Sequence, residues 1–212
     1  MRIETLVVGQ LQTNCYLVWD EKTEEGIIID PGDDAEYIIN KLRDFNIKPV
    51  AILATHGHFD HLLAVNELKM AYKIPFMLHK KDLSLLGRTR ESARYFTGLD
   101  VGPAPKVDIF LKNKDQIKFG QEKLQVLETP GHSPGGVGFY SKDRGVLFSG
   151  DTIFQGSVGR TDFSYSSETD LLKSIKKIFK LPLDTRILPG HGPETTIEEE
   201  KENFKQEFLQ DE

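Results

Sequence analysis

Residues 55–61 of the chain contain three histidines and one aspartate. Imidazole nitrogens and carboxylate oxygens are ligands that divalent transition metals prefer. One histidine in a loop is usually structural, and Asp60 alone would be an ordinary helix N-cap. Packing four such residues into one turn without a metal gains nothing that smaller side chains could not supply. The stretch therefore predicts a metal site that includes His56, His58, Asp60 and His61.

This stretch is expected in a turn between a strand and a helix. The apolar run 50–54 is typical of a buried strand. Leu62, Val65, Leu68 and Ala71 have the spacing of one helix face. Gly57 is expected to let the turn bend tightly without a Cβ clash.

Three more ligand-type residues follow apolar runs that end in glycine or proline. Residues 126–127 lead to Pro-Gly-His132, residues 146–148 to Gly-Asp151, and residues 187–188 to Gly-His191. Loops beyond strand ends are where binding residues concentrate. Each histidine alone is more often a turn residue, but together they give five histidines and two aspartates in one type of location. Seven ligands are too many for one tetrahedral ion. Two ions about 3.5–4 Å apart that share a carboxylate would use all seven.

Elsewhere the hydrophobic pattern predicts two similar halves, each with strands followed by helix. Strands are expected at 3–8, 14–19, 26–29, 74–78, 109–111, 116–119, 123–128, 136–140, 146–148 and 186–188. A first helix is expected after Asp33-Asp34, with Ile38, Leu42 and Phe45 on one side, and Pro49 is expected to separate it from the next strand. Further helices are expected at 82–96, 169–179 and 197–209, and a loop at 97–106.

The composition, with 38% hydrophobic and 28% charged residues, is that of a soluble globular protein, and the length suits one large domain or two small ones. A net charge of −6 argues against nucleic-acid binding. The single cysteine, Cys15, allows no internal disulfide and is expected in the core. Since no signal-peptide core and no membrane-length apolar run is present, a cytoplasmic location is expected.

Two other groups of residues have competing interpretations. His79 has no ligand-type neighbour in the sequence and is expected to be a surface or partly buried histidine. Residues 88–96 hold three arginines and two aromatic rings, which fit a substrate mouth and a solvated connection equally well.

Together, the stretch 55–61, Pro-Gly-His132-Ser-Pro-Gly, Gly-Asp151-Thr and Gly-His191-Gly resemble the signature of the metallo-β-lactamase-fold superfamily. The stretch Asp30-Pro-Gly fits its early acidic motif. Residues 150–163 and 192–197 resemble the small, single-domain glyoxalase II-like hydrolases within it. The resemblance implies an α/β (α+β) fold, a four-layer αββα sandwich of two mixed β-sheets flanked by helices, in a single domain of residues 1–212.

The same resemblance implies the role of each ligand. It assigns His56, His58 and His132 to a first metal and Asp60, His61 and His191 to a second. Asp151 is assigned to both metals. Asp30 is implied to bond a ligand and fix its orientation.

The implied activity is metal-dependent hydrolysis of a glutathione-type thioester, as by a hydroxyacylglutathione hydrolase. Two divalent ions, zinc foremost with iron or manganese as alternatives, would activate a water, so no serine or cysteine nucleophile is required. Asp60 is expected to accept and pass on a proton. The expected partner is a small-molecule thioester, with no nucleic acid or membrane, and the protein is expected to be a monomer or weak homo-oligomer. Similar Gly-Arg-Thr-Asp-Phe stretches in related subfamilies favour Arg160 and Asp162 as a structural pin over substrate contacts or a surface ion pair.

Two departures from the family pattern stand out. Only about twenty residues follow His191, whereas full-length glyoxalase II has a helical C-terminal region that helps hold glutathione. Asn203-Phe204 stands where the small subgroup usually shows Asn-Pro, which is expected to be a local packing difference.

The main alternative is a persulfide dioxygenase, which residues 159–163 also resemble. Those enzymes use one iron held by residues matching His56, His132 and Asp151. Residues 151–158 favour the hydrolase. Lactone or β-lactam hydrolysis would use the same metal chemistry. A scaffold without activity is disfavoured because all seven ligands are present, and nucleic-acid processing is disfavoured by size and by charge.

Overall fold

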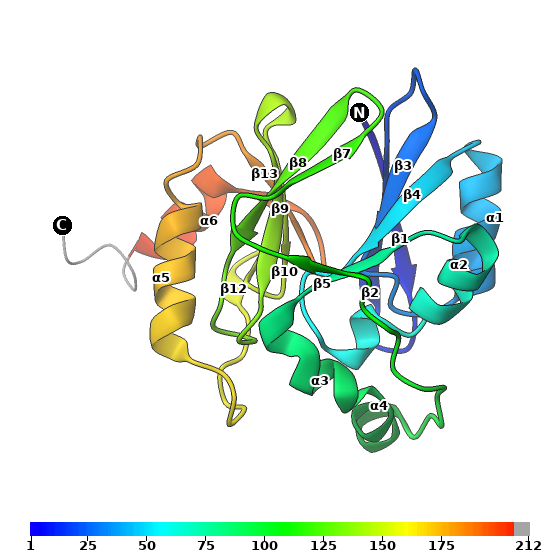
Figure 1. Cartoon of the computed structure of the whole chain (residues 1–212). Helices are drawn as coiled ribbons and strands as arrows, with labels where there is room; N and C mark the ends of the chain where they lie inside the picture. The colour runs from blue at the N-terminus through cyan, green and yellow to red at the C-terminus, as the bar shows by residue number, and fades with distance from the viewer. Residues whose placement is uncertain (206–212) are drawn as a thin grey trace.

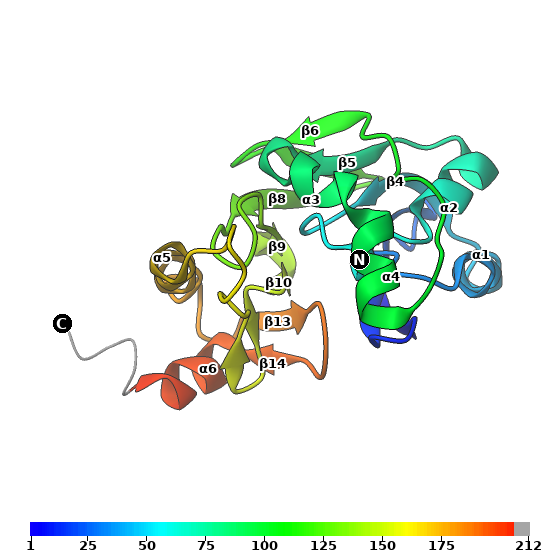
Figure 2. The same cartoon turned by 90° about the horizontal axis from the view of Figure 1, so that it is seen from below.

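The computed structural model describes residues 1–205 of the chain, and its core is formed by two β-sheets packed against each other (Figures 1 and 2). The first sheet has the order β1 (Arg2–Val8), β2 (Thr13–Trp19), β3 (Glu25–Ile29), β4 (Lys48–Leu53), β5 (Phe76–His79), β6 (Ile109–Leu111). Its first three strands are antiparallel, and β3 to β6 are parallel. The sheet is therefore mixed, as expected.

The second sheet is built by the other half of the chain. Its order is β14 (Thr195–Thr196), β13 (Arg186–Pro189), β10 (Val146–Gly150), β9 (Val137–Ser141), β8 (Glu122–Glu128), β7 (Gln116–Phe119). Only β10 and β13 run parallel. A small hairpin, β11 (Ile153–Phe154) and β12 (Ser157–Val158), follows β10. Lys142–Arg144 forms the short η3 turn between β9 and β10.

Helices cover the outer face of each sheet, so the layers follow the order αββα (Figure 1). On the first sheet these are α1 (Ala35–Asp44) and α2 (Val65–Tyr72), and on the second α5 (Glu168–Ile178) and α6 (Ile197–Asn203). The core has three clusters, one between the sheets and one beneath each helical layer. The between-sheet cluster contains Val18 and Leu53 from the first sheet and Val126 and Phe148 from the second, all fully buried. The four-layer prediction is confirmed.

Two short helices, α3 (Leu83–Gly87) and α4 (Thr89–Thr97), lie near one end of the sandwich (Figure 2). They replace the single helix predicted at 82–96. The break falls at Arg88, whose N–H turns back to the Leu85 carbonyl at 2.9 Å. No helix within the described residues is long and apolar enough to cross a membrane.

Several predicted boundaries are wrong because tertiary hydrogen bonds decide them. The helix after the histidine stretch begins at Val65, since Leu63 and Ala64 donate their N–H groups to the carbonyls of Gly32 and Pro31. Pro49 lies inside β4 instead of before it, beside a register shift of β3 at Gly26.

Smaller corrections concern three other elements. The strand predicted from residue 74 starts at Phe76, after Pro75, and includes His79. Phe45 lies just after α1 and stacks on Trp19, with ring centroids 5.5 Å apart. The helix α6 ends at Asn203. Residues 206–209 of the predicted terminal helix lie outside the described residues.

Candidate metal centre

All seven predicted ligands meet where strands of both sheets end. His56, His58, Asp60 and His61 follow β4, with the last two in the short η1 helix (Phe59–His61). His132 follows β8, Asp151 follows β10, and His191 follows β13. A Cβ on Gly190 would overlap Asp151 Oδ1, so this glycine allows the backbone before His191 to approach the carboxylate. The sheets therefore bring residues up to 135 positions apart, from His56 to His191, into one cluster.

The first group consists of His56, His58 and His132. His58 Nδ1 lies 2.9 Å from His56 Nε2 and 3.0 Å from His132 Nε2. Three nitrogens bound to one tetrahedral zinc at 2.0–2.1 Å would lie about 3.3 Å apart. The three side chains therefore fit one ion with a small outward adjustment.

The second group consists of Asp60, His61 and His191. Asp60 Oδ2 lies 3.3 Å from His191 Nε2 and 3.6 Å from His61 Nε2. Asp151 lies between the groups, with Oδ1 3.5 Å from His61 Nε2 and Oδ2 3.6 Å from His132 Nε2. This is the position that a carboxylate shared by two ions requires.

Hydrogen bonds on the outer side of the first group fix how its imidazoles are protonated. The Thr55 hydroxyl donates to Asp30 Oδ2 at 2.7 Å, so its oxygen accepts the Nδ1–H of His56 at 3.1 Å. His132 Nδ1 donates to the Arg160 carbonyl at 2.9 Å. His58 Nε2 lies 2.8 Å from the Tyr165 hydroxyl. The bonds of His56 and His132 leave the Nε2 atoms that face the cluster with a free lone pair, and a Tyr165 hydroxyl that accepts from His58 Nε2 would leave His58 Nδ1 in the same state.

The second group is supported in the same way. His191 Nδ1 donates to the Leu11 carbonyl at 3.0 Å. His61 Nδ1 lies 3.1 Å from Asp30 Oδ2, where the resemblance placed Asp30. Asp30 is held by the Thr55 N–H at 2.7 Å and has a left-handed backbone, with φ 51°.

Three buried side-chain atoms of the cluster lack a hydrogen-bond partner among residues 1–205: His61 Nδ1, His61 Nε2 and Asp151 Oδ1. The last two face each other at 3.5 Å. A buried polar atom without a partner costs roughly 1–3 kcal/mol. A divalent ion would satisfy the two facing atoms, so the donor set fits a metal centre of imidazoles and carboxylates.

The charges differ between the two groups. Burial and the neighbouring imidazoles lower the pKa of His56, and they lower that of His58 to about 3, so both rings are neutral. Burial also opposes charge on His61, but Asp60, Asp151 and Asp30 outweigh it and raise its pKa to about 10. Without a metal, His61 is therefore protonated at neutral pH, and a bound ion would have to displace that proton; the three carboxylates beside it make the site attract cations.

Asp82 is a supporting residue that the sequence did not indicate. Its fully buried carboxylate accepts hydrogen bonds from the Gly57 N–H at 2.9 Å, the Ser133 hydroxyl at 2.7 Å and the Gly135 N–H at 2.5 Å. It therefore joins the loop of His56 and His58 to the loop of His132. A Cβ on Gly57 would lie 2.8 Å from the Asp82 carbonyl, and its φ is not positive. Gly57 is thus required because the Asp82 backbone lies close to its Cα. The predicted reason, a tight bend of the turn, is different.

The loop after β12 forms another support. The Arg160 guanidinium is paired with Asp162 at 2.6 Å and lies 4.3 Å from the centre of the Phe163 ring. Phe163 in turn stacks on Tyr165, with centroids 5.2 Å apart and planes at 14°. The Arg160–Asp162 pair is exposed, and Arg160 also lines a cavity over the cluster, so its role as a structural pin stays a prediction. Tyr165 is a residue near the site that the sequence did not reveal.

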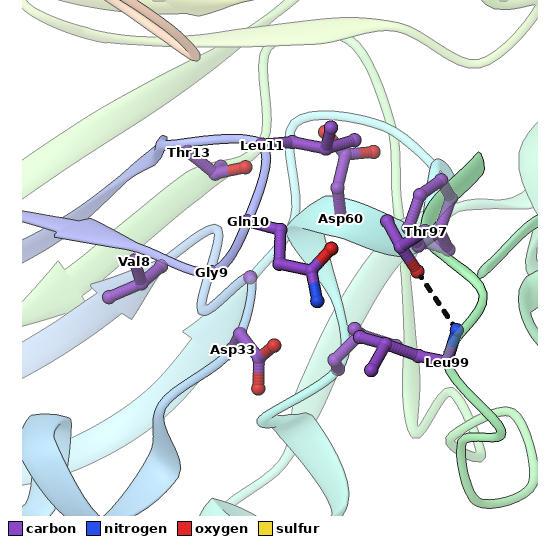
Figure 3. Close-up of a pocket in the computed structure, with 12 residues that line it drawn as sticks. Val8, Gly9, Gln10, Leu11, Thr13, Asp33, Asp60, Thr97 and Leu99 are labelled. Atoms are coloured by element: carbon purple, nitrogen blue, oxygen red, sulfur yellow. Dashed lines mark hydrogen bonds between the residues drawn. The ribbon is translucent and has the colours of Figure 1, made fainter.

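A cavity of about 270 Å³ opens over the cluster. Its walls include Leu11, Phe96 and Phe163, and its floor includes His58, Asp60, His132 and Asp151. A separate hollow lies behind Asp60, between the β1–β2 turn and the end of α4, and Gln10 projects into it (Figure 3). Its volume of about 10 Å³ suits one water molecule, so this hollow is too small to admit a substrate.

His79 and Cys15 lie apart from this centre. His79 is buried, with 8% of its surface exposed, so the prediction of a surface or partly buried histidine is wrong, and its Nε2 lies 3.3 Å from an acidic neighbour, Glu128 Oε1. Cys15 is fully buried in the first core cluster, as predicted.

Comparison with known proteins agrees with this geometry. Residues 8–191 match the family model of the metallo-β-lactamase superfamily. The chain belongs to this superfamily. It is therefore a member of a group of metal-dependent hydrolases.

Three similar proteins cover nearly the whole chain. Hydroxyacylglutathione hydrolase GloC of Haemophilus influenzae is 36% identical over 209 residues, which span 95% of each chain. The crystal structure of the BLEG-1 B3 metallo-β-lactamase is 40% identical, has a TM-score of 0.88, and covers 95% of this chain and 97% of its own. That of TTHA1623 in a di-iron-bound form is 40% identical, has a TM-score of 0.85, and covers 94% and 98%.

Proposed function

We propose that this protein hydrolyses a glutathione-type thioester with two divalent metal ions held by the seven clustered side chains. The observation that carries the proposal is the pair of three-ligand groups joined by Asp151 at the floor of the cavity. The thioester class is supported by the similarity to a hydroxyacylglutathione hydrolase over 95% of both chains. Two ions are supported by the similarity to a protein in a di-iron-bound form.

The bound ions would supply a hydroxide at neutral pH and a Lewis acid for the thioester carbonyl. His56, His58 and His132 would hold one ion and Asp60, His61 and His191 the other, with Asp151 between them. The nucleophile does not come from the protein. Cys15, the single thiol, is fully buried, and burial raises its pKa.

Asp60 is assigned the proton transfer. It lines the cavity, and its Oδ2 is 3.3 Å from His191 Nε2. Burial raises the pKa of this carboxyl, but His61 and His191 outweigh that effect and hold the pKa below its ordinary value. Asp60 is therefore ionised at neutral pH, and it would take up the proton that the attacking hydroxide brings to the acyl product and pass it to the leaving thiolate.

Metal content and turnover test the proposal together. Protein purified without chelators is expected to contain two ions per chain by mass spectrometry, zinc or a mixture with iron or manganese. His191→Ala, which removes one ligand of the second group, is expected to retain about one ion and to lose most hydrolysis of S-lactoylglutathione. His79→Ala serves as a control, since His79 lies outside the cluster. A wild-type chain with one iron, which consumes oxygen with a persulfide and does not hydrolyse the thioester, would establish the dioxygenase instead.

β-Lactam hydrolysis is a second candidate, because a B3 metallo-β-lactamase is among the similar structures. The same metal chemistry serves an amide ring and a thioester. Turnover of a chromogenic cephalosporin, measured beside S-lactoylglutathione on the same preparation, separates the two. The thioester proposal expects a kcat/KM for the thioester at least a hundredfold higher.

A further inference from the structure

The cavity over the metal cluster continues into an outer chamber. This chamber also has a volume of about 270 Å³ and lies between α3, α4 and the loop that carries Phe163. Both spaces share the wall residues His58, Phe59, Ser92, Phe96, Phe163 and Tyr165. A substrate whose reactive bond lies over the cluster would therefore place one end in the outer chamber.

The shared walls consist of two pairs of stacked aromatic rings. Phe59 and Phe96 stack with planes at 8° and centroids 6.0 Å apart. Phe163 and Tyr165 stack at 14°. Flat apolar walls suit a slender, flexible chain between the reactive bond and a polar end.

The outer chamber has two charged residues of opposite sign, Arg88 and Glu91. They stand three positions apart where α4 begins, so both can face the same space. Neither side chain forms an ion pair or hydrogen bond within residues 1–205, with each other or with any other residue. Arg90 differs, since it is paired with Asp100 at 2.8 Å. The chamber thus offers an unpaired cation and an unpaired anion to a ligand.

We propose that the outer chamber binds the zwitterionic α-amino acid end of the substrate's thiol portion, with Arg88 on its carboxylate and Glu91 on its ammonium group. This inference rests on the proposed thioester hydrolase and names what its leaving group must carry. A glutathione-type thiol has such an end, joined to sulfur by a flexible chain. A thiol carrier rich in phosphates would be repelled by Glu91, and a purely apolar carrier would leave both charges unmatched.

The test of Arg88 measures binding apart from catalysis. Isothermal titration of the metal-loaded protein with S-methylglutathione, a thioether that cannot be hydrolysed, gives the affinity of the chamber. Because Arg88 is exposed, Arg88→Gln is expected to weaken binding by about twofold to fivefold through loss of the charged pair. The matched control is Arg94→Gln, because Arg94 is exposed on the same helix and lines neither space. Equal affinities of both variants, or no binding to the wild-type protein, would overturn the proposal.

A modified ligand tests Glu91. The analogue in which glutaryl replaces the γ-glutamyl group lacks only the ammonium. The wild-type protein is expected to bind it about fivefold to tenfold more weakly than S-methylglutathione, whereas Glu91→Gln is expected to bind both equally. An unchanged preference in Glu91→Gln would exclude its role.

Turnover of S-lactoylglutathione on the same preparations keeps this inference separate from the proposed function. If the wild-type protein turns over S-lactoylglutathione but Arg88→Gln binds S-methylglutathione as tightly as the wild type, the role of the outer chamber is wrong and the proposed hydrolase stands. If Arg88→Gln alone loses binding of S-methylglutathione but the wild-type protein does not turn over S-lactoylglutathione, the role of the outer chamber stands and the proposed hydrolase is wrong.

Discussion

Tyr165 is the residue outside the ligand set that most directly supports the first metal group. Its hydroxyl lies 2.8 Å from His58 Nε2, and its ring is stacked on Phe163. Loss of such an outer hydrogen bond typically costs 10–100-fold in metal affinity. Tyr165→Phe keeps the stacked ring and removes only the hydroxyl, so we expect metal affinity at the first group to fall about tenfold.

Competition with a chromophoric chelator measures this effect directly. Tyr95→Phe is the control, since the Tyr95 side chain is 83% exposed and forms no hydrogen bond within residues 1–205. If both variants retain the wild-type affinity for two ions, the Tyr165 hydroxyl does not position His58.

The contrast between Tyr165 and the ligands shows what local sequence can reveal at this scale. His56, His58, Asp60 and His61 lie together in the chain, and the other three ligands each follow a recognisable strand end. Tyr165 is 107 positions from His58 and lies in a loop with no pattern of its own. Its role depends on how the loop is folded, which a stacked ring and the Arg160 pair decide. The sequence did not indicate the role of Asp82 for the same reason.

At the scale of elements, the short η2 turn (Lys80–Asp82) links loops from the two sheets through one carboxylate. Asp82 accepts three hydrogen bonds and donates none. In Asp82→Asn an amide nitrogen replaces one of the two accepting oxygens. It then faces at least one of the three donors and cannot accept that hydrogen bond. We expect unfolding free energy to fall by about 2–3 kcal/mol, because a buried hydrogen bond to a charged group is lost.

Urea denaturation of the metal-free protein measures this change without interference from bound ions. Asp100→Asn is the control, because Asp100 is exposed and its pair with Arg90 is expected to contribute little. Equal midpoints for the two variants would mean that Asp82 does not hold the loops together.

Several strands could be predicted at this scale because their apolar runs are buried on both faces, as in Ile27–Ile29 of β3 and Val146–Phe148 of β10. Helix starts were less predictable. The spacing of Leu62 and Val65 suits a helix, but the N–H groups of Leu63 and Ala64 bond to the loop after β3 instead. The break at Arg88 likewise depends on how α3 and α4 pack, so local pattern alone did not indicate it.

At the scale of the whole molecule, the ligand set joins the two sheets. Four ligands follow β4 of the first sheet, and His132, Asp151 and His191 follow strands of the second. Each proposed ion therefore has ligands from both halves of the sandwich. Opening the interface between the sheets would break both sites, so metal binding must stabilise the arrangement of the halves as well as the loops.

Removal of metal should therefore destabilise the entire sandwich. Binding to the folded state alone stabilises it by RT ln(1 + [L]/Kd), which is about 2.7–4.1 kcal/mol at 100–1,000 times Kd. Because two ions are proposed and this value applies to one site, we expect the unfolding free energy of the metal-loaded protein to exceed that of the metal-free protein by up to about 5.4–8.2 kcal/mol. The gain should appear as a higher urea midpoint of one cooperative transition. His191→Ala should gain less from the same metal concentration, since its second group has lost a ligand that the second sheet supplies. If two bound ions left the wild-type midpoint unchanged, the ligands would not be joining the sheets in the folded state.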